Sequence, residues 1–243
     1  MNYYIMTPTT IILSIIIIVL IYVLYAYVTS TVTTMQPTAS LKTGVPPISM
    51  IEGATNTRYG YSLWLYVNTW DSNIEKTIFS RNENIKLYLD QTSPTLKLDL
   101  AMNTKDENDK TKYETMIITN NFPLQKWVSI AVSVDNQFAD VYLDGKLVKS
   151  QRFYISNTDG NNGIHPKIPP AAGSSPVILG NGDTPFDAFV TEFKRWTVPI
   201  DPESAWDNYL AGNGTNSISR AFSSYGIDVA VLKNNVEQTR FSF

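Results

Sequence analysis

Apolar residues form one uninterrupted stretch near the N-terminus and short alternating runs over the rest of the chain. The stretch 11–28, IILSIIIIVLIYVLYAYV, holds Ser14 as its only strongly polar residue apart from tyrosine hydroxyls. Its eighteen residues would reach roughly 27 Å as a helix, and flanking threonines bring it to the thickness of a bilayer's hydrocarbon core. The pattern predicts a single-pass transmembrane helix over about 10–28, with the lipid bilayer as partner and anchor residues Ile11, Ile15, Ile18, Tyr22 and Tyr25.

A cleaved signal peptide is the alternative to a permanent anchor. It would carry a basic segment before the apolar core and a small-x-small cleavage site after it. Here no charge of either sign precedes Lys42, and Tyr25-Ala26-Tyr27 is a poor cleavage site. We therefore expect residues 1–28 to stay in the mature protein as a membrane anchor, whose orientation the missing basic residues leave open.

The chain changes character after the anchor. Segment 29–47 is rich in threonine, contains three prolines and shows no apolar periodicity, so it predicts an extended stalk between membrane and domain. The domain is expected at 48–243, with a C-terminal extension from about 215.

Alternating apolar runs between turn signals predict strands throughout the domain. Both faces of 61–68 are aromatic or aliphatic, which indicates a strand covered on both sides. The expected strands are 61–68, 77–81, 85–90, 95–102, 113–119, 127–134, 138–143, 146–152, 177–179, 189–197 and 226–232.

Two local signals refine this pattern. Asp144-Gly145 predicts a two-residue type I′ hairpin turn, because that turn needs positive φ at both central residues. Asp201-Pro202-Glu203 predicts a helix with an N-cap, a proline at its first position and an end near 212. Many strands with short connections and one short helix predict an all-β fold, an antiparallel β-sandwich of the jelly-roll type.

Composition narrows the function classes. The 19 Lys and Arg against 22 Asp and Glu give a net charge of −3, and the pI is near 5.2, which argues against nucleic acid as a partner. The chain has no cysteine, so disulfides, thiolate zinc sites and cysteine nucleophiles are excluded.

Three stretches of the domain carry a family resemblance. They are the aromatic strand 61–67, the hairpin 127–146 with its W-x-hydrophobic-A and hydrophobic-Y-hydrophobic-D-G patterns, and the C-terminal part 177–212. Over about 48–214 the chain resembles the concanavalin A-like lectin/glucanase superfamily, in its laminin-G-like branch. Thr191 and Ala188 stand where this family usually has Asp and Gly. The signature residues are Trp64, Trp127, Tyr142, Asp144, Gly145, Gly180 and Glu192.

The whole arrangement resembles a second group. With its anchor and the segment 223–243, the chain is similar to membrane-anchored sandwich proteins of large icosahedral double-stranded DNA viruses. That resemblance implies a minor capsid protein of the virion, which links the inner membrane to the shell and has other capsid or membrane-associated proteins as partners. The tail 226–243 is then either a docking segment or one more strand of the sandwich.

Catalytic patterns are missing from the sequence. Glucanases of this fold use two carboxylates on one strand, in an E-x-D-x-(x)-E pattern that the chain lacks. His165 is the only histidine and has no nucleophile elbow near it, so a serine triad has no basis. We therefore expect a non-enzymatic structural or interaction protein.

Calcium and sugar binding stay open as alternatives. Asp159 and Asn161 in one loop, and Asp183 and Asp187 in another, offer oxygen ligands for calcium, although such residues also make turns without metal. No other cofactor is expected. Trp70 and Tyr154 at strand ends are candidate sugar platforms, whereas Trp64, Trp127 and Trp196 have the pattern of core residues. The alternative function is a membrane-anchored, carbohydrate-binding lectin with a glycan as partner.

Overall fold

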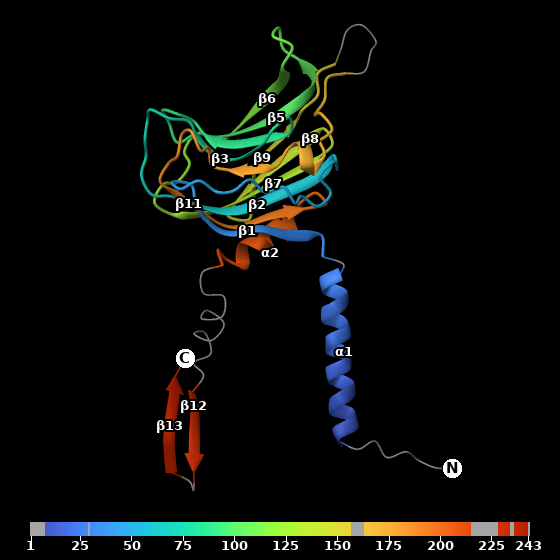
Figure 1. Ribbon diagram of the computed structural model, residues 1–243, viewed down its shortest axis with the longest axis vertical. Coiled ribbons are helices and arrows are strands. Elements are labelled where there is room, and N and C mark those ends of the chain that lie inside the picture. The colour runs from blue at the N-terminus through green and yellow to red at the C-terminus, as the bar shows by residue number, and fades with distance from the viewer. Residues whose placement is uncertain (1–7, 29, 157–162, 215–227, 234–235, 243) are drawn as a thin grey trace, which may run out of the picture.

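The protein folds into a two-layered β-structure with elements projecting from it. The computed structural model describes residues 8–28, 30–156, 163–214, 228–233 and 236–242, with side chains described for 12–25, 30–156 and 163–214 (Figure 1). It confirms the prediction of an all-β, antiparallel sandwich of two sheets.

Six strands form one sheet in the order β1-β11-β2-β7-β8-β9. Their bounds are β1 Val32–Ser40, β2 Arg58–Val67, β7 Trp127–Asp135, β8 Phe138–Leu143, β9 Lys146–Arg152 and β11 Ala188–Trp196. Five strands form the other sheet in the order β10-β3-β4-β5-β6, namely β3 Lys76–Arg81, β4 Ile85–Leu89, β5 Leu96–Lys105, β6 Thr111–Thr119 and β10 Val177–Leu179. A short 3-10 turn, Ala172–Ser174, precedes β10.

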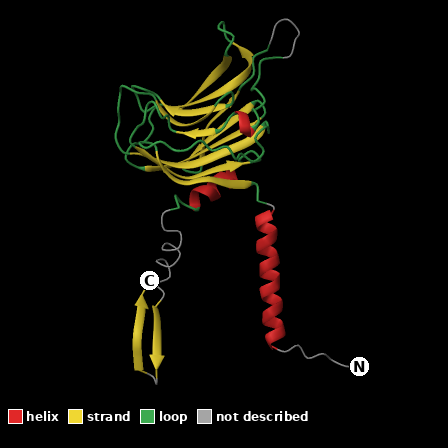
Figure 2. Cartoon of the chain, viewed as in Figure 1, coloured by secondary structure: helices red, strands yellow, loops and turns green. Residues whose placement is uncertain are grey.

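The core lies between the two sheets (Figure 2). Alternate residues of each strand point inward, as Leu63, Leu65 and Val67 do on β2, and none of these three is more than 1% exposed. Tyr61 stacks on Phe193 with ring centres 5.8 Å apart, which joins β2 to β11 through their inner faces. Aliphatic and aromatic burial of this kind is the main source of stability in a sandwich.

The outer face of the six-stranded sheet is covered by helix α2, Pro202–Leu210 (Figure 2). The Asp201 carboxylate accepts a hydrogen bond from the Ser204 amide at 2.8 Å, so the predicted N-cap is confirmed. Tyr209 of α2 stacks on Trp64 of β2 with ring centres 5.6 Å apart. This contact explains why β2 is apolar on both faces.

The hairpin between β8 and β9 has the expected turn. Asp144 and Gly145 have φ of 47° and 75°, as a type I′ turn requires. A Cβ added at Gly145 would lie 2.8 Å from Cε3 of Trp206, so the turn packs closely against α2.

The stalk predicted at 29–47 is wrong over 32–40, because these nine residues form β1. This strand pairs antiparallel with β11, from Val32 opposite Trp196 to Ser40 opposite Phe189. Ala39 is 7% exposed and belongs to the core. Pro37 is tolerated here because β1 is an edge strand, where one side of the backbone needs no sheet partner.

Two further elements project from the sandwich on the side of β1 and α2 (Figure 1). Helix α1, Pro8–Val28, ends four residues before β1 begins. Among the residues whose side chains are described, no helix has the length and apolar character needed to cross a membrane. At the other end of the chain, β12 Asp228–Lys233 pairs with β13 Val236–Ser242 in a separate two-stranded sheet, and neither strand pairs with a described strand of the sandwich.

Candidate functional site

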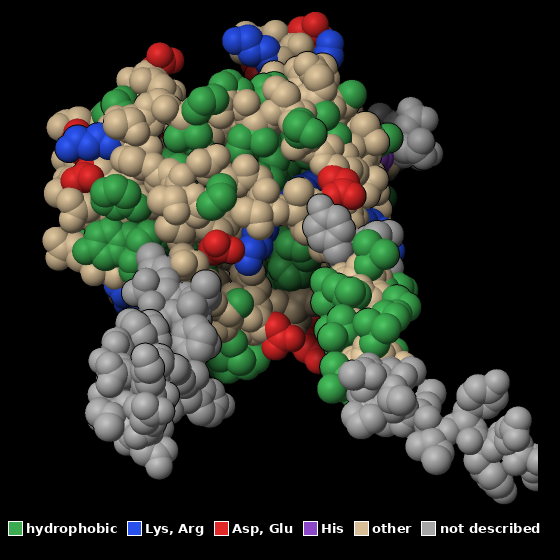
Figure 3. All heavy atoms as spheres, turned by 60° about the horizontal axis from the view of Figure 1, so that its bottom comes forward, with side chains coloured by type: hydrophobic (Ala, Val, Ile, Leu, Met, Phe, Trp, Pro, Cys, Tyr) green, Lys and Arg blue, Asp and Glu red, His purple; other side chains and the backbone are tan. Residues whose placement is uncertain are grey.

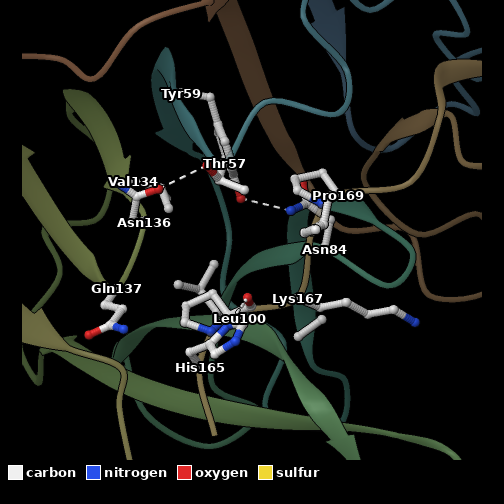
Figure 4. Close-up of a pocket in the computed structure, with 13 residues that line it drawn as sticks. Thr57, Tyr59, Asn84, Leu100, Val134, Asn136, Gln137, His165, Lys167 and Pro169 are labelled. Atoms are coloured by element: carbon white, nitrogen blue, oxygen red, sulfur yellow. Dashed lines mark hydrogen bonds between the residues drawn. The ribbon is translucent and has the colours of Figure 1, made fainter. Parts of the chain in front are cut away.

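A cleft of about 320 Å³ opens at one end of the sandwich, and we call it the rim cleft (Figure 4). Tyr59 of β2 and Val134 of β7 line it from the six-stranded sheet, and Leu100 of β5 lines it from the five-stranded sheet. The turn residue Asn84 and the segment 165–169 complete the lining. The cleft therefore lies where the two sheets face each other at their rim.

The floor of the rim cleft is a buried pair, Tyr59 and Asn84. Tyr59 is 2% exposed and Asn84 is 3% exposed. The Asn84 amide nitrogen donates to the Tyr59 hydroxyl at 2.7 Å (Figure 4). Burial raises the pKa of the Tyr59 hydroxyl, which therefore stays protonated and can donate. The side-chain oxygen of Asn84 is buried and accepts no hydrogen bond from any described residue, so the floor offers a donor and an acceptor side by side.

The walls combine held polar groups with apolar ones. The Thr57 hydroxyl donates to the side-chain oxygen of Asn136 at 2.9 Å (Figure 4). Gln137 accepts from Arg152 at 3.0 Å. His165 is fixed through its amide, which donates to the Asn103 side chain at 3.0 Å. The apolar side of the wall is formed by Leu100, Val134, Ile168 and Pro169.

Charge at the rim cleft is positive or paired. Lys167 lies on the wall with its Nζ 3.1 Å from a carboxylate oxygen of Glu83. Hydrogen bonding and attraction by Lys167 lower the pKa of Glu83. None of the described lining residues is an aspartate or a glutamate. The described lining thus lacks the two facing carboxylates that most glycosidases use.

The structure describes two of the four calcium candidates, Asp183 and Asp187. Asp159 and Asn161 lie outside the described residues. Asp187 accepts from the Asn68 side chain at 2.7 Å, and the Asp183 amide donates to Asn181 at 3.1 Å, so each takes part in a local contact of its loop. Within the described part of the chain, no three His, Asp or Glu side chains are grouped to hold a metal ion.

A cationic side chain lies over each candidate sugar platform, and Tyr154 remains 36% exposed. Lys76 places its Nζ 3.9 Å from the centre of the Trp70 ring, and Trp70 packs against the core. The Arg152 guanidinium lies 4.4 Å from the centre of the Tyr154 ring. Of the tryptophans with a core pattern, Trp64 is buried, whereas Trp127 and Trp196 are only half-buried.

None of the signature residues lines the rim cleft, and most of them lie at the β8–β9 turn or on the strands beneath α2. Asp144 accepts from the Ser129 amide at 3.0 Å, and Tyr142 is 2% exposed beneath α2. Glu192 has φ of 51° at a bulge in β11 and pairs with Lys194 at 3.0 Å, and Gly180 has φ of 73°. The anchor residues Ile15, Ile18, Tyr22 and Tyr25 are 56–69% exposed on α1, whereas the Ile11 side chain is outside the described set.

Sequence reasoning did not find the rim cleft. Its floor joins Tyr59 and Asn84, and its walls add Asn136 and His165, which come from segments far apart in the chain. From the sequence, His165 is a candidate only for a serine triad. The available signal was an asparagine in each of the polar turns RNEN and DNQ. Polar turns contain asparagine whether or not they bind a ligand.

Comparison with known proteins gives a family but no characterised relative. The model of the concanavalin A-like lectin/glucanases superfamily matches residues 42–205. No curated protein matches the chain significantly.

Several solved structures are similar to part of the chain at low identity. The binding domain of botulinum neurotoxin serotype D is 15% identical with a TM-score of 0.49, over 72% of this chain and 42% of that one. The receptor-binding domain of botulinum neurotoxin type G is 17% identical with a TM-score of 0.44, over 64% and 38%. The serotype D ligand-binding domain in complex with N-acetylneuraminic acid is 17% identical with a TM-score of 0.44, over 65% and 37%.

These neighbours are much longer than the shared region, since the match covers 42% or less of each. The family model, in contrast, matches 164 consecutive residues from 42 to 205 of the 243. That range contains every sandwich strand except β1. The chain therefore belongs to the concanavalin A-like lectin/glucanases superfamily.

Proposed function

We propose that the protein is a non-enzymatic carbohydrate-binding module and that the rim cleft is its binding site. The observation that carries the proposal is the floor of the cleft, where the Asn84 amide nitrogen donates to the protonated Tyr59 hydroxyl and the Asn84 side-chain oxygen accepts from no described residue. Sugar hydroxyls both donate and accept, so they match such a pair. The apolar wall suits the C–H face of a sugar ring, and the volume lies at the lower end of small-ligand sites.

The proposal is tested on a glycan array with the full chain in detergent. Tyr59→Phe removes the hydroxyl and keeps the ring, so it should weaken glycan binding by about tenfold. Tyr61→Phe is the matched control, because Tyr61 lies on the same strand and is buried but does not line the cleft. The bound glycan should be recovered uncleaved. Absence of any bound glycan, or equal binding by Tyr59→Phe and wild type, would contradict the proposal.

A second part of the proposal is that α1 anchors the module in a bilayer as a single-pass helix. The support is the exposure of its large apolar side chains, from 47% at Ile17 to 66% at Ile18, on every side of the helix. At its full backbone length, Pro8–Val28, the helix has 21 residues and would measure about 31 Å, close to the thickness of the hydrocarbon core.

Membrane extraction tests the anchor. Ile17→Arg should cost about 2.5–3.5 kcal/mol at mid-span on insertion scales and release the protein into the carbonate-soluble fraction. Ile17→Leu is the control and should stay with the membrane. Wild-type protein in the soluble fraction, or a mature N-terminus near residue 30, would contradict the anchor.

A connector role in a virion is the second candidate function. It is favoured by the β12–β13 hairpin, which pairs with no described strand of the sandwich and lies on the same side as α1 (Figure 1). An element outside the folded domain is free to pair with another protein, such as a capsid protein above the inner membrane. Crosslinking mass spectrometry of purified particles tests this role, and particles that incorporate protein truncated after Gly214 as well as wild type would contradict it.

A further inference from the structure

Two buried arginines lie behind the floor of the rim cleft. Arg81 and Arg195 are each 1% exposed. The Arg195 guanidinium carbon is 4.2 Å from the centre of the Tyr59 ring, and Arg195 donates to the Gly53 carbonyl at 3.2 Å. Arg81 donates to the carbonyls of Ala54 at 2.8 Å, of Ser175 at 3.0 Å, and of Pro170. Within the described residues, neither arginine forms an ion pair.

Carbonyls and aromatic rings contact the two guanidinium groups without neutralising them, and Nε and Nη1 of Arg195 donate to no described acceptor. An arginine stays protonated inside a protein, and a buried charge without an opposite charge is costly. Burial lowers the pKa of Arg195 accordingly. Both positive charges also pull the pKa of Tyr59 down, against the larger upward effect of burial. The two arginines therefore act electrostatically on a group that lines the cleft.

The walls do not supply the missing negative charge. Glu83 is paired with Lys167, and Asp135 with Arg58 at 2.9 Å. Arg152 contacts the wall residue Gln137 and adds a further positive charge. The described surroundings of the rim cleft thus hold more positive than negative charge, at a site that is partly enclosed by low-dielectric protein.

We infer that the rim cleft selects acidic sugars, meaning pyranoses that bear a carboxylate or a sulfate group, over neutral ones. The protonated Tyr59 hydroxyl donates to the anionic group, and the Asn84 oxygen accepts from a ring hydroxyl. Attraction across low-dielectric protein strengthens the contact more than the same charges would in water. This inference rests on the proposed function, since it names the ligand class of the same site.

Isothermal titration calorimetry on the full chain in phosphatidylcholine nanodiscs tests the inference with D-glucuronate, D-glucose and inorganic sulfate. Glucuronate and glucose differ only at C6, so their ratio reports the effect of the carboxylate. Glucuronate should bind about five- to tenfold more tightly than glucose. Equal binding of the two sugars would overturn the inference and leave the proposed function standing. Binding of neither sugar, or of sulfate alone, would overturn both.

Two variants assign the preference to the buried charge. Arg195→Met removes the charge at similar volume and should reduce the glucuronate preference at least threefold, whereas Arg195→Lys keeps the charge and should retain most of it. If melting curves show that Arg195→Met does not fold, Lys167→Gln serves instead, because it removes a charge from the wall and leaves Glu83 unpaired. A preference unchanged in the folded variant would overturn the inference.

Discussion

At position 145, both the backbone conformation and the packing against α2 require a glycine. Its φ of 75° is in the left-handed region, and an added Cβ would meet Trp206 at 2.8 Å and Tyr209 at 3.1 Å. Gly145→Val should therefore lower the free energy of unfolding by about 2–4 kcal/mol, through backbone strain and displacement of α2. Urea denaturation measures the loss.

Gly44 provides the matched control for this substitution. A Cβ there would meet no atom within 4 Å, and its φ lies outside the left-handed region. Gly44→Val should change the urea midpoint little. Equal stability of the two variants would mean that the turn and α2 do not pack as described.

Asp90 gives the fold a measurable acid dependence. Hydrogen bonds from Lys97 first, and then from the Thr92 amide, lower its pKa from 3.8 to about 2. Because the folded pKa lies below the unfolded one, the contribution is complete above 3.8 and is lost as the pH falls through about 2. Asp90→Asn should thus be less stable than wild type at pH near 6, and the difference should shrink as the pH approaches 2.

Lys97→Gln checks the assignment, since it removes the principal donor. Urea midpoints measured against pH should show that the difference from wild type shrinks toward acid pH for Lys97→Gln as it does for Asp90→Asn. A difference between wild type and Asp90→Asn that stays constant down to the acid limit would contradict the ion pair.

At the scale of elements, the alternating runs predicted the sandwich strands well and missed one. Strands such as β7 could be predicted directly, because their aliphatic residues recur at every second position and face the core between the sheets. Strand β1, VTTMQPTAS, has no such pattern, because an edge strand with one neighbour buries few of its side chains. The rim cleft was equally unpredictable, since its polar residues become neighbours only after both sheets have formed.

Strand β1 can be tested through Ala39, its buried residue. Ala39→Asp places a carboxylate without a partner in the core and should destabilise the domain by about 3 kcal/mol or more. Thr38→Asp is the control, because Thr38 is exposed on the same strand. Thermal denaturation separates the two readings: an extended stalk at this segment would tolerate both substitutions equally.

At the scale of the whole molecule, the β12–β13 hairpin is expected to be independent of the sandwich. Truncation after Gly214 keeps the hydrogen bond from the Thr191 hydroxyl to the Asn213 carbonyl and removes the hairpin. The melting temperature should stay within about 2 °C of wild type, because less than about 1 kcal/mol is lost. A large drop would show that the segment completes the domain after all.

The pairing of β1 with β11 also dictates an order of events during synthesis. Ser40 and Phe189 are partners 149 positions apart, and Val32 and Trp196 are 164 apart. At typical elongation rates, β1 leaves the ribosome roughly 10–30 s before the strand it must join. If α1 enters a bilayer during that interval, β1 is held at the membrane surface with its backbone unpaired. Folding then ends when β11, which is synthesised late, pairs with β1, which is already tethered. Slowing elongation between codons 41 and 188 should therefore raise the yield of aggregated or proteolysed chains.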